Sequence, residues 1–146
     1  MKLNGARDIP VPPSELWQLI LDQEILKKCI PGCEELSQVD GIDYKIVMLS
    51  KVGPIKARFV GKVVIDKTEL PERCKLLGEG TGGVAGFVKG SAAMQIEPAQ
   101  GGSRLHFDAE VEIGGKIASL GDRLFRGVVE RNIEQLFDSL QHEVTI

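Results

Sequence analysis

The chain has 146 residues, of which 42% are hydrophobic and 27% are charged, and its formal net charge is -3. These values are typical of one ordinary soluble domain, which we place at residues 1–146, and they exclude the basic surface that nucleic-acid binding requires. No apolar run approaches the roughly 20 residues of a membrane span, and the N-terminus lacks an export signal, so a cytoplasmic protein is expected.

Residues 1–9 are predicted to form a strand, because they end at three prolines, at positions 10, 12 and 13, that cannot continue a strand ladder. The same prolines can open a helix, and the apolar stripe of Leu16, Trp17 and Ile20 indicates that one follows. A second short helix is predicted at about residues 23–29, before Pro31.

Alternation of apolar and polar residues dominates from residue 36 to residue 113, with turn residues at intervals of roughly ten. The pattern is clearest at residues 55–65 and 105–113, and it predicts an antiparallel meander with one dry face and one wet face. A strand running through residues 52–67 would be about 50 Å long at about 3.3 Å per residue, so we expect it to bend, most readily at Gly61.

Apolar residues return to helical spacing after Gly115, from Ile117 to Leu140. This pattern predicts a helix about 40 Å long with charged residues on its opposite side. The expected fold is therefore α+β: a curved antiparallel sheet wrapped around a long C-terminal helix, with two short helices after the first strand.

The strand residues that should face the helix are unusually small, and an apolar ligand cavity is the predicted consequence. An empty space of roughly 300 Å³ would cost about 7 kcal/mol, so such a cavity should be occupied or collapsible. In the alternative interpretation, the aromatic and methionine side chains lean inward and form an ordinary core. The predicted ligand-binding residues are Ala57, Phe59, Leu76, Phe87, Ala92, Met94, Phe107, Ala109, Leu120, Gly121, Leu124 and Val128.

No catalytic or metal-binding constellation is predicted. Most carboxylates of the meander fall on the outward face, which leaves Tyr44 and Cys74 as inward candidates for proton transfer. Cys74 has no basic neighbour on its own face, so an inert buried thiol is expected. A register slip at a bulge would move carboxylates inward. The predicted outward residues are Asp66, Glu79, Glu97, His106, Asp108, Glu110 and Glu112.

Three cysteines and two histidines match no zinc spacing, and an odd cysteine count is compatible with a reducing compartment. The glycine-rich segment 80–90 lacks the Gly-Lys-Ser/Thr ending of a phosphate-binding loop. We interpret it as a mobile hairpin at the cavity mouth, with Val84, Ala85 and Phe87 as an apolar tip; a plain flexible turn is the alternative.

Several local motifs occur together with this order of elements. They are Asn4-Gly5 with Ile9-Pro10-Val11-Pro12, Leu16-Trp17, Leu26-Lys27-Lys28-Cys29-Ile30-Pro31-Gly32-Cys33-Glu34, Val52-Gly53-Pro54-Ile55-Lys56-Ala57, Gly78-Glu79-Gly80 through Gly86-Phe87-Val88-Lys89-Gly90, and Gly114-Gly115-Lys116-Ile117 with Leu120-Gly121. Across nearly the whole chain the sequence resembles the carbon monoxide dehydrogenase CoxG family, which belongs to the helix-grip, START-like (SRPBCC) superfamily.

The resemblance implies an accessory role beside a molybdenum hydroxylase of the CO dehydrogenase type, with a lipid-like or quinone-like ligand and no cofactor of its own. It also implies peripheral contact with the inner face of the membrane, although this sequence stops at Ile146, where family members often continue into a tail. Two alternatives stay open. One is an enzyme of the cyclase or hydrolase type with Tyr44 as its acid, and the other is an assembly factor that uses segments 29–34 and 82–86.

Overall fold

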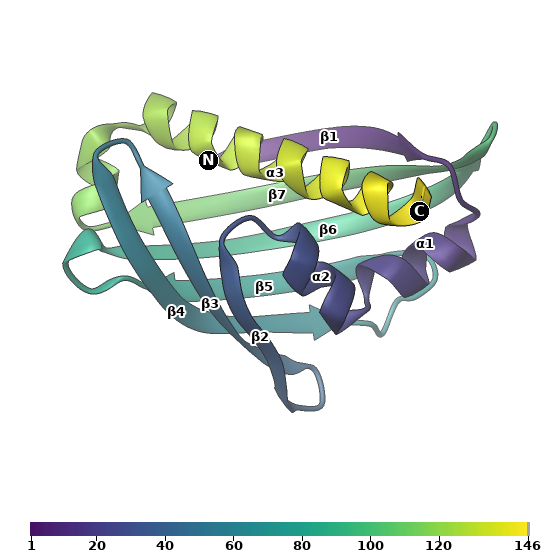
Figure 1. Cartoon of the computed structure of the whole chain (residues 1–146), viewed down its shortest axis with the longest axis horizontal. Helices are drawn as coiled ribbons and strands as arrows, with labels where there is room; N and C mark the ends of the chain where they lie inside the picture. The colour runs from purple at the N-terminus through teal and green to yellow at the C-terminus, as the bar shows by residue number, and fades with distance from the viewer. Residues whose placement is uncertain (146) are drawn as a thin grey trace.

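The computed structural model describes residues 1–145, and Ile146, the last residue of the predicted domain, lies outside them. The described residues form a seven-stranded antiparallel sheet in the order β1-β7-β6-β5-β4-β3-β2. Figure 1 shows the sheet curving around the C-terminal helix α3. The strands are β1 (Lys2–Ile9), β2 (Cys33–Asp40), β3 (Asp43–Val52), β4 (Ile55–Asp66), β5 (Cys74–Thr81), β6 (Phe87–Ala99) and β7 (Gly102–Gly114).

The alternation predicted for the meander is confirmed in the strands. Along β4, exposed Lys56 and Arg58 alternate with partly buried Ala57 and Phe59. Along β7, Leu105 is buried, whereas the acidic side chains of the opposite parity are exposed. One face of the sheet is therefore concave and apolar beneath α3, and the other, which we call the outer face, carries the charges.

β4 is strongly curved (Figure 1), as the sequence predicts for a strand of this length. A Cβ atom added at Gly61 would lie 1.8 Å from the carbonyl oxygen of Glu79, so β5 passes too close for any side chain. Glycine at this position permits the close approach of the two backbones.

Both predicted short helices are confirmed, α1 at Pro13–Ile20 and α2 at Gln23–Cys29. α1 begins with proline at its first position, where the missing N–H would have had no helical partner. α2 begins after Asp22, whose carboxylate accepts hydrogen bonds from the backbone N–H groups of Glu24 and Ile25, at 2.9 and 3.2 Å.

The predicted start of the C-terminal helix is wrong. Residues Lys116–Leu120 form a 3₁₀ helix, η2, and α3 begins only at Asp122 and extends to Thr145. Gly121 separates the two with a φ of 95°, a left-handed conformation that breaks the helix. With 24 residues, α3 is about 36 Å long, close to the predicted length.

The hydrophobic core consists of two separate clusters along the concave face. The first lies at the end of the molecule that carries α1 and α2, and it contains Leu16, Leu105 and Leu140. The second contains Val52, Ala85, Ile117, Phe125 and Val128. α3 contributes to both clusters and therefore spans the concave face from one to the other, as Figure 1 shows.

Candidate functional site

A stripe of very small residues crosses the concave face between the two core clusters. In the sheet register, Gly61 of β4 pairs with Gly80 of β5, Gly78 of β5 with Gly90 of β6, and Ala92 of β6 with Ala109 of β7. We call these six residues the glycine–alanine stripe. Neither Ala92 nor Ala109 belongs to either core cluster.

Space is available above the middle of this stripe. A Cβ atom added at Gly78 would have no neighbour closer than 3.8 Å, which is ordinary van der Waals contact. At Gly90 the closest atom would be the carbonyl oxygen of Glu110, at 3.2 Å, and the closest side-chain atom would belong to Val111, at 3.8 Å. At both glycines the atoms nearest to an added Cβ are a backbone oxygen and a valine methyl group, and only Gly78 would accept the Cβ without a shift.

Most of the predicted ligand-binding residues border this stripe on the concave face. Met94 and Phe107 pack against the first core cluster, as does Leu76 of β5. Ala57 and Phe59 pack against the second cluster, of which Val128 of α3 is a buried member. Their contact with a ligand stays a prediction, but their placement leaves apolar walls on both sides of a small-residue floor.

The prediction that Phe87 faces the cavity is wrong. Strand alternation places Phe87 on the outer face, where its side chain is 40% exposed and its ring lies over Gly114. The predicted apolar tip also differs, because Ala85 is buried in the second core cluster within the short 3₁₀ helix η1 (Gly83–Ala85). Only Val84, which is 90% exposed, projects as a tip.

The prediction that Gly121 is a ligand-binding residue is also wrong. It is an exposed joint between η2 and α3, with open space around its Cα atom, and it does not line the concave face. Leu120 of η2 packs against the second core cluster. Leu124, in the first turn of α3, is 39% exposed, and its side chain lies against Gly53 in the β3–β4 turn.

The charged residues of the meander lie on the outer face, where ion pairs hold several of them. Lys2 approaches Glu110 to 3.7 Å, Lys62 approaches Glu79 to 3.4 Å, and His106 lies 2.9 Å from Glu97. Tyr44, by contrast, is buried in the first core cluster. The concave face of β4, β5, β6 and β7 is therefore apolar where a ligand would lie against it.

The three cysteines are thiols of low reactivity. Burial raises the pKa of Cys29, Cys33 and Cys74 above the ordinary thiol value. A raised pKa favours the protonated thiol, which is a weaker nucleophile and metal ligand than the thiolate. Cys74 is fully buried, as the sequence predicted.

The sequence interpretation missed one charged residue on the concave side, Arg7 of β1. Its guanidinium donates hydrogen bonds to Glu134 at 3.4 Å, to Gln141 at 3.4 Å and to Asp138, and it lies 5.9 Å from the ring of Phe137. These contacts tie the C-terminal half of α3 to an edge strand. The signal was present in the sequence, because Arg7 has the same parity as the buried residues Leu3 and Ile9.

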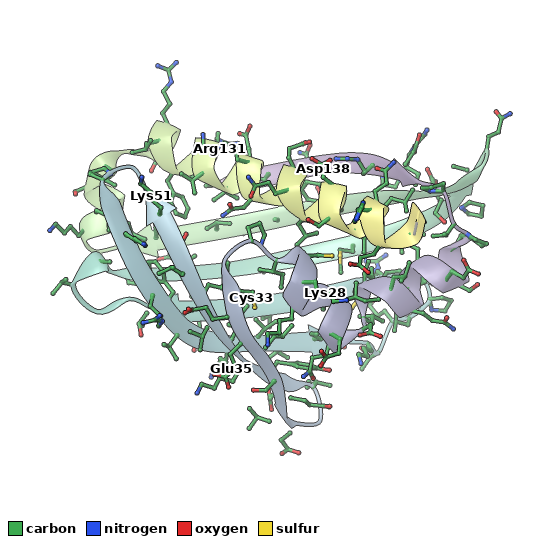
Figure 2. All side chains as sticks on the ribbon, in the orientation of Figure 1. Lys28, Cys33, Glu35, Lys51, Arg131 and Asp138 are labelled. Atoms are coloured by element: carbon green, nitrogen blue, oxygen red, sulfur yellow. The ribbon has the colours of Figure 1, made fainter. Side chains whose placement is uncertain are left out.

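Two pockets open at the surface of the described residues. One, of about 400 Å³, is formed by α2, the α2–β2 connection and the polar side of α3. Figure 2 labels Lys28, Cys33 and Asp138, which border this pocket from three elements. The other, of about 390 Å³, is lined mainly by residues of the outer face, such as Leu77, Ser91 and Ala93, and its lining also includes Leu76, Ala92 and Ala109.

Within residues 1–145, no group of three or more histidine, cysteine or carboxylate side chains could hold a metal ion. In the same part of the chain, no helix has both the length and the apolar character needed to cross a bilayer.

The curved sheet, the gripping helix and the small-residue floor define a protein of the helix-grip class. The chain superposes on a conserved protein from Geobacillus kaustophilus with a TM-score of 0.92 and 28% identity, covering 99% of this chain and 95% of that one. A Thermus thermophilus protein gives a TM-score of 0.74 at 21% identity, with 99% and 97% coverage. The Zhui aromatase/cyclase of a Streptomyces species gives 0.71 at 11% identity, with 98% and 92% coverage.

The sequence profile of CoxG, a subunit of carbon monoxide dehydrogenase, matches residues 5–145. The chain therefore belongs to the carbon monoxide dehydrogenase CoxG family, which confirms the resemblance noted from the local motifs. No functionally curated protein matches the chain in sequence.

Proposed function

We propose that this protein binds one lipophilic molecule, quinone-like or lipid-like, between the concave face and α3, and serves a molybdenum hydroxylase of the CO dehydrogenase type as an accessory carrier. The observation that carries the proposal is the glycine–alanine stripe, which separates two core clusters beneath a helix that spans both. An ordinary core would place large side chains there, because protein interiors are close-packed.

Hydrophobic burial provides the binding energy in this proposal. An apolar guest that loses about 300 Å² of accessible surface gains about 7 kcal/mol, at about 25 cal/mol per Å². Part of that gain offsets the cost of immobilising the ligand. The concave face supplies few polar groups, so selectivity follows from shape and chain length more than from hydrogen bonding.

Retention of decylubiquinone tests this proposal. The purified protein is incubated with the quinone, passed through a desalting column and extracted with organic solvent. About one equivalent of quinone per chain, measured by its ultraviolet absorbance, is the expected result. Recovery no greater than that of a control protein of similar size would contradict the proposal.

The family assignment supports the proposal that a CO dehydrogenase-type hydroxylase is the partner. The pocket beside α2 is the proposed site of contact with that enzyme. That pocket includes residues 27–33, which overlap the 29–34 segment that the sequence interpretation assigned to partner contact. We place the protein in the cytoplasm, as a single domain at the inner face of the membrane. Co-purification with a CO dehydrogenase-type hydroxylase, lost when Lys28→Glu is introduced, is the expected outcome.

An enzyme is the alternative, since the Zhui protein of the same fold is named an aromatase/cyclase. Tyr44 is the inward-facing candidate for its acid, but it is buried among apolar side chains of the first core cluster. We predict that Tyr44→Phe leaves decylubiquinone retention within twofold of the wild type. Turnover of an aromatic polyketide that is abolished by this substitution would instead favour the enzyme.

A further inference from the structure

Three connections meet at one end of the molecule, the end opposite α1. They are the β3–β4 turn, the β5–β6 connection with η1, and the β7–α3 connection with η2, and Figure 1 shows them together. Their contacts are direct, since Ala85 of η1 and Ile117 of η2 share the second core cluster with Val52 of β3. We call these three connections and the residues that flank them the loop end.

Two apolar side chains at the loop end are exposed. Val84 at the tip of η1 is 90% exposed, and Leu124 at the start of α3 is 39% exposed. Ala85 anchors η1 in the core, so the exposed position of Val84 follows from a fixed turn. A hydrophobic tip held outward in this way can gain free energy by burial in a second surface.

Cations surround these apolar side chains. Lys51 and Lys56 lie directly opposite each other in the β3–β4 register, both are exposed, and a like-charged cross-strand pair disfavours the hairpin. Figure 2 shows Lys51 at this end of the molecule. Three further exposed cations, Lys89, Lys116 and Arg123, lie on adjoining elements.

The charge balance of the loop end differs from that of the chain. Among residues 1–145, none of these five cations forms an ion pair, whereas Lys2, Lys45, Lys62 and Lys75 each do. The carboxylates beside these five cations are Glu79 and Glu112, which are the cross-strand partners of Lys89, and Asp122, which precedes Arg123. Because the whole chain is acidic, with a net charge of -3, positive charge is concentrated at this end.

We propose that the loop end docks the protein onto an anionic lipid bilayer, with Val84 inserted and the five cations facing the headgroups. This inference rests on the proposed function, since it names the surface through which a membrane ligand would be collected. Apolar insertion and attraction to anionic lipid together stabilise peripheral binding, and the electrostatic part is screened by salt.

Co-sedimentation with vesicles tests the proposal. One set of vesicles contains phosphatidylcholine alone, and the other contains phosphatidylcholine and phosphatidylglycerol in a 3:1 ratio. The wild type should sediment with the anionic vesicles and be released by high salt. The double variant Lys51→Glu/Lys56→Glu should bind them about tenfold more weakly or worse. Val84→Asp should weaken binding several-fold.

Matched controls place the same changes elsewhere on the surface. Lys27→Glu/Lys28→Glu reverses two exposed lysines of α2, and Val39→Asp alters a 69% exposed valine in the β2–β3 hairpin, which projects away from the loop end in Figure 1. Both controls should bind anionic vesicles within twofold of the wild type. Equal losses in the controls, or no wild-type binding, would overturn the proposal.

Decylubiquinone retention is also measured for each loop-end variant in the absence of vesicles. This second measurement distinguishes a failure of bilayer docking from a failure of ligand binding. The loop-end variants should retain the quinone at the wild-type level, which makes their vesicle defect one of docking. If they lose co-purification with a protein partner while vesicle binding stays unchanged, the loop end is a protein interface and the bilayer proposal is wrong.

Discussion

Replacing Ala92 with tryptophan is expected to reduce decylubiquinone retention at least tenfold while the protein stays folded. Ala92 lies on the concave face, with Leu76 and Ala109 as its cross-strand partners on either side. An indole there occupies the floor of the proposed site, and the space that admits a ligand also admits the ring. Retention is measured by solvent extraction after desalting, and folding is measured by circular dichroism.

Ala93→Trp is the matched control for this prediction. Ala93 is the next residue of β6, so strand alternation directs its side chain to the outer face, although both Ala92 and Ala93 are among the residues that line the 390 Å³ pocket. The Ala93→Trp variant should retain the quinone at the wild-type level, since the outer face is not the proposed site. Loss of the quinone in the Ala93 variant, with retention in the Ala92 variant, would move the ligand to the outer face and contradict the account.

The largest effect on stability is expected at Gly61. In Gly61→Ala, the new methyl group would lie 1.8 Å from the carbonyl oxygen of Glu79, and it can be accommodated only if β4 and β5 separate. We predict a loss of about 3 kcal/mol or more in the free energy of unfolding, measured by urea denaturation, because overpacking against a backbone cannot be relieved by rotating a side chain.

Gly78→Ala provides the comparison on the adjoining strand. Its added methyl group has no neighbour closer than 3.8 Å, so the free energy of unfolding should change by less than about 1 kcal/mol. If the two alanine variants were equally destabilised, the stripe above Gly78 would be packed and the proposed space would not exist.

Periodicity predicted the elements of this fold well, because each element buries one face. The limits of α2 agree with the structure, and the alternation in β4 and β7 identified their concave residues. The curvature of β4 (Figure 1) could be predicted from strand length. These features depend on local residue patterns that tertiary contacts reinforce.

The errors arose where local pattern and burial disagree. Alternation counted from Ala92 already places Phe87 on the outer face, but its apolar character favoured an inward prediction. Ile117 and Leu120 fit the spacing of a helix, and only the left-handed φ of Gly121 shows that α3 begins after it. Arg7 was missed because a charged residue on a concave face needs partners, and those partners lie more than 120 positions away.

Native mass spectrometry of freshly purified protein tests the central claim most directly. The account predicts a population heavier than the bare chain by the mass of one lipophilic molecule, which leaves on denaturation and is depleted in the Ala92→Trp variant. A single species at the mass of the bare chain, unchanged after incubation with decylubiquinone, would contradict it.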